Sequence, residues 1–180
     1  MVVTSWSYAL KQAAAGFVPS VSRTGLVTDM SNWFSNFLPF DTEMVYEGIP
    51  FDCVETFYQA MKSENKEDWA RISKMTASES KRAGRALVLR PDWDQVKEKF
   101  MMQALRHKFD PVTGPHWHAI LMSSKNEAII EWNHWHDTYW GKCTCSRHDG
   151  VGSNRLGYLL TQLRTEYQIQ QEDLGRRDLD

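Results

Sequence analysis

The sequence predicts a single helix-rich α+β domain with a few short strands, and three observations support this fold class. Of the 180 residues, 42% are hydrophobic and 24% are charged, an ordinary balance for one globular domain with a buried core. Apolar residues recur at helical spacing in the longest patterned segments, whereas the strand-like patterns are short. The chain contains no internal repeat or low-complexity linker. We therefore expect an N-terminal arm at 1–26, one domain at 27–169 and a charged C-terminal tail at 170–180.

The first expected elements are a β-hairpin and two helices. The segment 44–51 is typical of two short strands joined at Glu47 and Gly48, because glycine permits the positive φ that a tight turn requires. A helix is predicted at 54–63, with Asp52 as its N-cap. The next predicted helix covers 76–86, although the glycine within it weakens the helical propensity.

The second half of the chain is predicted to be mostly helical. Apolar residues after Pro91 recur every three or four positions as far as Phe109, and this pattern defines the clearest helix. A helix is also expected at 116–122, a strand at 128–132 and a last amphipathic helix at 156–167. The charged residues 170–180 are expected to fray.

The charge distribution bears on the class of ligand. The net charge of −2 argues against a protein that grips long stretches of duplex nucleic acid by neutralising phosphates. Residues 71–108, however, hold ten Lys or Arg against four acidic residues, so this segment carries +6 and the remainder −8. A basic segment of this kind suits a ligand that bears phosphate, but a solvated helix face explains it equally well.

Composition also bears on location. No apolar run reaches the roughly 18 residues that a membrane span needs, and no targeting signal is evident. The three cysteines are an odd number, with two of them only two positions apart, so a disulfide framework is not expected. We expect a cytoplasmic protein that does not contact membranes.

Glu55 is the first candidate for chemistry. Together with Gln59 and Lys62 it lies on one face of the predicted helix, because these residues are four and three positions apart. A carboxylate, an amide and an ammonium on one face suit the activation of water, the orientation of a sugar hydroxyl and the binding of phosphate. The same spacing also fits a capping box between Asp52 and Glu55, in which Glu55 only accepts a hydrogen bond from the backbone.

A second carboxylate, Asp137, precedes Trp140 and Gly141, and this glycine permits close backbone approach. Hydrolysis of a glycosidic bond needs a carboxylate that directs water or stabilises the cationic sugar. Several of the eight tryptophans stand beside polar residues, so they suit either an aromatic-lined cleft or an ordinary core. They are Trp93, Trp132, Trp135 and Trp140.

The glycine-rich segment 150–157 opens the last predicted helix, and Ser153 or Asn154 can cap it. Exposed amides at a helix N-terminus bind phosphate, so Gly152 and Asn154 are candidates for this role. No P-loop signature follows the glycines, and a plain junction between a loop and a helix is an equally good interpretation.

Five potential metal ligands lie within fifteen positions of one another. They are His134, His136, Cys143, Cys145 and His148. Their spacing matches neither paired Cys-x-x-Cys motifs nor the signature of zinc deaminases. We therefore expect no metal, and no cofactor of any other kind.

Several motifs, taken in order, resemble the NADAR family. They are 33–37 (WFSNF), 55–62 (ETFYQAMK), 83–85 (AGR), 90–93 (RPDW), 108–109 (KF), 137–141 (DTYWG) and 152–157 (GSNRLG). The resemblance covers about residues 30–165. It implies an α+β fold with N-glycosidase activity: some members of the family act on ribosylaminopyrimidine phosphates of riboflavin synthesis, and others remove ADP-ribose from modified guanine in DNA.

The resemblance also implies roles for individual residues. Glu55 matches the acidic catalytic residue of the family, Asp137 its second acidic residue and Trp93 its stacking tryptophan. The expected substrate-binding residues are Asn36, Phe37, Gln59, Lys62, Arg85, Trp93, Trp140, Gly141, Gly152 and Asn154. Thr56 departs from the family, which often has histidine there, and the segment 142–148 is longer than the usual glycine-rich link.

These observations lead to one expected function and two alternatives. The expected function is hydrolysis of the bond between a base and a phosphorylated ribose. The partner is then a small phosphorylated ribosyl ligand or an ADP-ribosylated nucleotide in DNA. The alternatives are a non-catalytic module that binds ADP-ribose or NAD, and a helical interaction module with a tryptophan-rich core. Glu55 and Asp137 favour hydrolysis, because anionic groups near a diphosphate would weaken simple binding. The oligomeric state stays open.

Overall fold

The computed structural model describes residues 26–27 and 33–177. The arm predicted at 1–26 therefore lies outside the described residues except for Leu26, and so does the end of the chain after 177. In chain order the elements are β1 (Leu26–Val27), β2 (Pro39–Tyr46), β3 (Ile49–Cys53), α3 (Val54–Ala60), α4 (Lys66–Ile72), α5 (Ala77–Ala83), α6 (Trp93–Phe109), α7 (Pro115–Ser123), β4 (Ala128–Ile129), β5 (Trp132–Asn133), β6 (Lys142–Cys143) and α8 (Arg155–Arg177). The predicted α+β class is confirmed.

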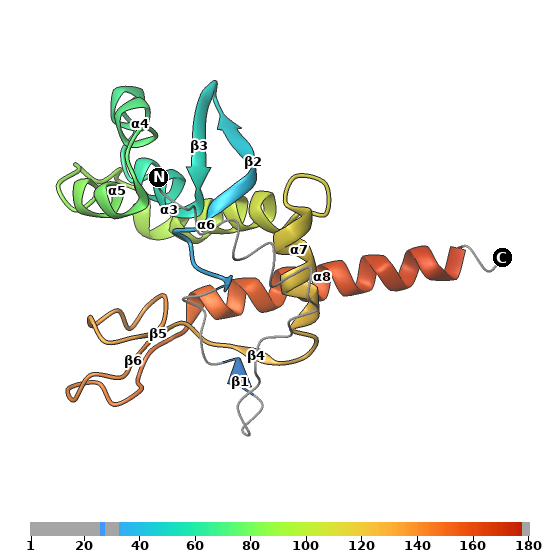
Figure 1. The fold of residues 1–180 in the computed structure, drawn as a ribbon. Helices are drawn as coiled ribbons and strands as arrows, with labels where there is room; N and C mark the ends of the chain where they lie inside the picture. Colours follow the sequence, from blue (N-terminus) through green and yellow to red (C-terminus); the bar gives the residue numbers. More distant parts are fainter. Residues whose placement is uncertain (1–25, 28–32, 178–180) are drawn as a thin grey trace, which may run out of the picture.

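The hairpin β2–β3 has the turn that the sequence predicts. The strands pair antiparallel with Met44 opposite Phe51, and the turn consists of Glu47 at φ 48° and Gly48 at φ 81°. Two successive residues with positive φ are the mark of a tight hairpin turn whose twist matches that of the strands. In Figure 1 the hairpin stands beside α4, above α3 and α6.

Helix α3 begins at Val54, as predicted, but its N-cap lies one residue later than expected and the helix ends at Ala60 rather than at 63. Strand β3 continues through Cys53, which is the N-cap, and its amide donates to Thr56 Oγ1 at 3.4 Å. The expected capping box between Asp52 and Glu55 is therefore wrong, because Thr56 occupies the position from which a side chain reaches back to the cap. Glu55 is left with no capping role.

The remaining helices follow the sequence pattern with one addition. Helix α5 begins at a capping box in which Thr76 Oγ1 accepts from the Glu79 amide, and α6 and α7 lie where they were expected. The addition is α4, whose N-cap Asn65 accepts from the Glu67 amide at 2.9 Å. Sequence reasoning missed it because seven residues rich in charge show no apolar period.

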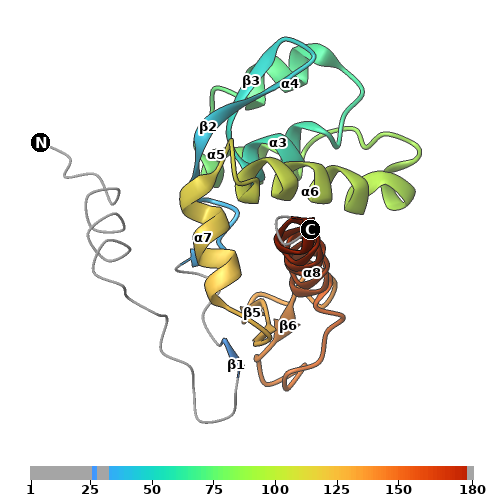
Figure 2. The same cartoon turned by 90° about the vertical axis from the view of Figure 1, so that its right-hand side faces the viewer.

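The core lies between the hairpin, α3, α6, α7 and α8. Phe57 on α3 is fully buried, and its ring centre lies 5.3 Å from those of Tyr46 and Phe51 and 6.2 Å from that of Phe100. Figure 2 shows α6 crossing above α8, with α7 beside them and β5 and β6 below. This packing fixes α3 against the hairpin, so the polar residues on its other side face away from the core.

The C-terminal part contains two further differences from the prediction. The strand expected at 128–132 is split into β4, which pairs parallel with β1, and β5, which pairs parallel with β6. Helix α8 continues to Arg177, so residues 170–177 are helical rather than frayed, although every residue from Ile169 to Arg176 is exposed. Within 26–27 and 33–177, no helix combines the length and the apolar character that crossing a membrane demands.

Candidate active site

A cavity of about 390 Å³ opens between α3, α5 and the loop that joins β5 to β6. We call one side the helical wall, formed by Glu55, Tyr58, Gln59, Lys62, Lys81 and Arg85, and the other the loop wall, formed by Glu131, Trp135, Asp137 and Trp140. Ser35, Asn36, Phe37, Met101 and Leu156 complete the lining. The structure therefore brings both predicted carboxylates, and the residues 36, 37, 59, 62, 85 and 140, to one cavity.

Glu55 is the buried carboxylate of the helical wall. Only 5% of its surface is exposed, and its Oε1 accepts a hydrogen bond from Gln59 Nε2 at 2.8 Å, one helical turn away. The Glu55 amide donates to the carbonyl of Asn36 at 2.9 Å, which ties the start of α3 to the segment before β2. Two buried oxygens of the lining, Asn36 Oδ1 and Gln59 Oε1, have no hydrogen-bond partner within the described residues. Both oxygens are covered by protein atoms, and Gln59 Oε1 lies against Gly84, so the side chain must rotate before either oxygen can accept from a ligand.

The surroundings of Glu55 change its acidity. Burial raises the pKa of the Glu55 carboxyl above its ordinary value of 4.5, and the negative charge of Asp137 acts in the same direction. The charges of Lys81 and Lys62 and the hydrogen bond from Gln59 oppose this rise without cancelling it. Burial also lowers the pKa of Lys62 below its ordinary value. A carboxyl with a raised pKa can exchange a proton at a pH closer to neutral than an ordinary one.

Three cations line the cavity. Lys62 follows α3, Lys81 lies on α5 and Arg85 lies just after it. The Lys81 ammonium lies 5.2 Å from the ring centre of Phe37 and 5.4 Å from that of Trp135, so it links the helical wall to the rim on the opposite side. Sequence reasoning did not single out Lys81. The only signal for it was its place in the basic segment 71–108.

Asp137 is held in the loop wall by its own turn. Its Oδ1 accepts from the amides of Tyr139 at 3.0 Å and Trp140 at 2.8 Å. Asn133 fixes the backbone of the same residue: its Nδ2 donates to the Asp137 carbonyl at 2.7 Å, and its Oδ1 accepts from the Asp137 amide at 3.1 Å. Trp140 Nε1 donates to the Tyr58 hydroxyl at 3.1 Å, which joins the two walls.

Gly141 is essential to the path of this loop. A Cβ there would overlap the carbonyl oxygen of Glu131, to which the Lys142 amide donates at 2.7 Å. The carbonyls of 138–141 in turn accept from the first amides of the segment 153–156. The loop wall is thus shaped by backbone contacts with segments that precede and follow it.

Four residues expected to bind substrate do not line the cavity. Trp93 is 8% exposed and packs behind Tyr58, with 5.1 Å between the ring centres. Gly141 and Gly152 lie against backbone, where a Cβ would collide with a carbonyl oxygen. Asn154 accepts from the Glu131 amide and donates to the Ile129 carbonyl, both at 2.9 Å, so its side chain joins neighbouring segments.

The phosphate site expected at the start of α8 is corrected by the same contacts. The Ser153 amide donates to the Thr138 carbonyl at 2.8 Å, and the amides of Arg155 and Leu156 donate to the carbonyls of Tyr139 and Trp140 at 3.0 and 3.1 Å. Amides that already serve the loop wall are not free to bind an anion. The cations of the helical wall are the better candidates.

Several lining residues were not assigned from the sequence. They are Ser35, Tyr58, Lys81, Met101, Glu131, Trp135 and Leu156. Trp135, which is 49% exposed, had been noted only for its polar neighbours. Ser35 is held by Lys108, whose Nζ donates to its carbonyl at 2.6 Å, and complete burial lowers the pKa of that lysine to about 7.

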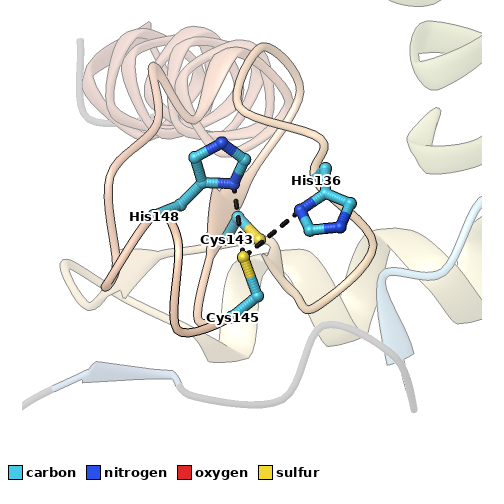
Figure 3. Close-up of side chains that lie close together, drawn as sticks. All are labelled: His136, Cys143, Cys145 and His148. Carbon is cyan, nitrogen blue, oxygen red and sulfur yellow. Dashed lines mark hydrogen bonds between the residues drawn. The ribbon is translucent and has the colours of Figure 1, made fainter.

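The sequence predicts no metal site, but the structure contains a cluster of potential metal ligands beside the loop wall. His136, Cys143, Cys145 and His148 converge there, with one potential ligand atom from each within 4.8 Å of all the others (Figure 3). His134, the fifth residue considered, does not belong to this group.

Comparison with known proteins finds one matching family and several relatives. The model of the family described as "NADAR domain" matches residues 25–168. N-glycosidase YbiA of Escherichia coli is 31% identical over 140 residues, which cover 76% of this chain and 82% of YbiA. N-glycosidase Npun_R5314 of Nostoc punctiforme is 32% identical over 139 residues, or 74% of this chain and 83% of that protein.

A plant relative and a solved structure complete the comparison. The chloroplastic riboflavin biosynthesis protein PYRR of Zea mays is 32% identical over 171 residues, covering 82% of this chain but only 26% of the plant protein. The NMR structure of Escherichia coli YbiA superposes with a TM-score of 0.64 at 30% identity, over 80% of this chain and 82% of that one.

Proposed function

This chain belongs to the NADAR family, and on that premise we propose that it hydrolyses the N-glycosidic bond between a base and a phosphorylated ribose. Its bacterial relatives are named N-glycosidases and are matched over four-fifths of their length. The reaction class is therefore that of a hydrolase acting on N-glycosyl compounds. The finer assignment, a phosphorylated ribosyl substrate, rests on the chemistry of the cavity.

The observation that carries the proposal is a buried carboxylate, Glu55, in a cavity lined by three cations. Burying a carboxylate costs free energy, and here the pKa of Glu55 is raised by that burial. No arginine or lysine forms a salt bridge with Glu55 among the ion pairs of the described residues. A carboxylate kept in this state is typical of a general base or a stabiliser of positive charge.

In the proposed reaction, water attacks the anomeric carbon of the ribose. The bond from this carbon to the base nitrogen breaks, and its electron pair leaves with the base. Glu55 accepts a proton from the attacking water, stabilises the positive charge that develops on the sugar, and returns the proton to the departing nitrogen. Asp137, across the cavity, adds negative charge that favours the cationic transition state. From a ribosylaminopyrimidine phosphate the products are the free pyrimidine and ribose 5-phosphate, and from ADP-ribosylated guanine in DNA they are ADP-ribose and DNA with unmodified guanine.

The cations and the aromatic rim define the rest of the substrate. Lys62, Lys81 and Arg85 supply positive charge for the phosphate. Phe37 and Trp135, exposed by 39% and 49%, offer flat faces at the rim on which a base can stack. A rotation of the Asn36 or Gln59 side chain would turn its unpartnered oxygen toward the sugar hydroxyls.

Two substrates fit this description, and different observations favour them. The plant relative is named for riboflavin biosynthesis, which favours a ribosylaminopyrimidine phosphate as the first candidate. The exposed Phe37 and Trp135 leave room beyond the rim, which favours the larger alternative, ADP-ribosylated guanine in DNA.

The test is direct. The purified protein is incubated separately with ribosylaminopyrimidine phosphate and with DNA that carries ADP-ribosylated guanine, and both products of each reaction are followed by mass spectrometry. We expect catalytic cleavage of one of them, to equal amounts of the free pyrimidine and ribose 5-phosphate or of unmodified DNA and ADP-ribose. Binding of ADP-ribose without cleavage of either substrate would contradict the proposal and support a non-catalytic ADP-ribose or NAD reader.

A further inference from the structure

A group of two cysteines and two histidines lies just outside the cavity and has no part in the proposed reaction. His136 comes from the loop between β5 and β6, Cys143 ends β6, and Cys145 and His148 belong to the turn that follows. Figure 3 shows the two sulfurs and the two rings pointing toward a common centre. His136 is exposed, Cys143 is fully buried, and the other two are half-buried, so the group reaches the surface on one side.

The distances are close to those of a metal centre. Cys145 Sγ lies 3.3 Å from His136 Nδ1 and 3.4 Å from His148 Nδ1, and no two of the four ligand atoms are more than 4.8 Å apart. Zinc binds sulfur at about 2.3 Å and nitrogen at about 2.0–2.1 Å, so the ligand atoms of a tetrahedral site lie about 3.3–3.8 Å from one another. Two of the distances already lie in or near this range, and the other pairs, at 4.8 Å or less, would move closer together when an ion binds.

The backbone holds these residues in place through hydrogen bonds. The Cys143 amide donates to the Val151 carbonyl at 3.0 Å, and its carbonyl accepts from the Gly150 amide at 2.7 Å. The Cys145 carbonyl accepts from the amides of His148 at 3.0 Å and Asp149 at 2.9 Å, which closes a tight turn. The ligand atoms are therefore presented by a bonded turn, and little chain entropy would be lost when an ion binds.

We propose that His136, Cys143, Cys145 and His148 bind a structural zinc ion. Two thiolates and two imidazoles are a ligand set that zinc prefers, and hard cations such as magnesium or calcium are bound by oxygen instead. Four protein ligands leave no open position for water or substrate, so the ion stabilises structure and takes no part in hydrolysis. Sequence reasoning rejected zinc because the spacing fits no standard motif, but the ligands come together through the fold.

The site would fasten the loop wall. His136 lies between Trp135 and Asp137, both of which line the cavity, and in this position it has φ 70°, a left-handed conformation that a non-glycine residue seldom adopts. A metal bond at His136 would hold that strained residue in place. The ion would thus stabilise the part of the chain that carries the second carboxylate.

The test measures metal and stability, with no need for a substrate. The protein is purified under reducing conditions without chelators, and zinc is determined by elemental analysis. We expect about one zinc per chain, lost in Cys145→Ser and in His136→Ala. The matched control is His134→Ala, because His134 is a neighbouring exposed histidine outside the group, and it should keep its zinc. Cobalt substitution should give the absorption bands of tetrahedral thiolate coordination in the wild type and not in Cys145→Ser.

Removal of the ion should also be visible as a loss of stability. A strong chelator should lower the melting temperature of the wild type by about 5 °C or more, and leave that of Cys145→Ser unchanged. Far-UV circular dichroism would confirm that both variants are folded, so that loss of zinc is not a result of unfolding. The proposal would be overturned by a reduced protein that takes up no stoichiometric zinc, by a variant that retains it, or by a chelator without effect on melting.

Discussion

The side chains of the two cavity walls are positioned by different kinds of interaction. In the helical wall, Glu55 and Gln59 project together because they are four positions apart on α3, and the turn that follows the helix brings Lys62 to the same side. In the loop wall, Asp137 and Trp140 are positioned by contacts with Asn133, by the glycine that follows them, and by amides at the start of α8. Local helical spacing thus positions the wall that contains Glu55, to which we assign proton transfer. Backbone contacts between segments distant in the sequence position the opposite wall.

Of the two walls, the loop wall should lose more stability and activity when a small side chain is added next to its backbone. In Gly141→Ala the added methyl group would overlap the Glu131 carbonyl, so the loop must shift. We expect destabilisation of about 1–3 kcal/mol and a loss of base release of about tenfold to a hundredfold, because Asp137 moves with the loop. Thermal unfolding and the release assay would measure both effects.

The control for this variant is Gly175→Ala on α8. A methyl group there would meet nothing within 4 Å, and alanine favours a helix, so stability should be unchanged or slightly higher. If Gly141→Ala were as stable and as active as this control, the backbone contacts would not be what shapes the loop wall.

Removing one cation from the helical wall should weaken phosphate binding without harming the fold. We expect Lys81→Gln to raise the Kd for ribose 5-phosphate about tenfold, since a hydrogen bond to a charged group contributes about 1.5–3 kcal/mol. The matched control is Arg82→Gln, because Arg82 is the next residue of α5 and does not line the cavity. Calorimetry should give the control the wild-type affinity, and equal affinities in the two variants would remove Lys81 from the phosphate site.

The smallest expected effect is a difference in how the melting temperature depends on pH when a carboxylate in or beside each wall is replaced. Glu55 has a raised pKa, so the stability that it contributes is complete below its ordinary value of 4.5 and is lost as pH rises through the folded-state value. Glu55→Gln should therefore melt at about the wild-type temperature at low pH and above it at neutral pH, where the wild type carries the cost of the buried charge.

Glu98 serves as the control, because its pKa is shifted in the opposite direction from that of Glu55. It accepts two hydrogen bonds of 2.6 Å from Arg155 beside the loop wall, and these hydrogen bonds, with that from Tyr139, lower its pKa. Its stabilising effect is present above its ordinary pKa and is lost as pH falls through the folded-state value. Glu98→Gln should thus melt below the wild type at neutral pH, with the difference shrinking in acid. Melting curves with the same sign for both variants would contradict the assigned environments.

The contrast between the walls also explains how much the sequence could predict. The turn at Glu47 and Gly48, helix α6 and the shared face of Glu55 and Gln59 follow from local rules, and the structure has all three. Whether Glu55 caps α3 or faces the cavity depended on which residue is the N-cap, Asp52 or Cys53. That boundary is set by pairing with β2, which no local rule contains.

The structure departs from the sequence expectations where segments that are distant in the sequence meet. Trp93 has the aromatic character of a stacking residue, but its packing against Tyr58 places it behind the cavity. Asn154 has the form of a helix-start anion site, but its side chain and the nearby amides serve the loop wall. Of the three histidines near Cys143 and Cys145 in the sequence, the fold brings His136 and His148 to the cysteines and leaves His134 outside the group.

The central claim is that the Glu55 carboxylate performs the hydrolysis, and one paired measurement tests it. Single-turnover release of base and calorimetric affinity for ribose 5-phosphate should be determined for the wild type, for Glu55→Gln and for Glu67→Gln, an exposed glutamate of α4 that serves as the control. We predict that Glu55→Gln loses about a hundredfold or more in rate while its affinity stays within about twofold of the wild type, and that the control changes neither. A Glu55→Gln protein that binds normally and still releases base at the wild-type rate would contradict the claim.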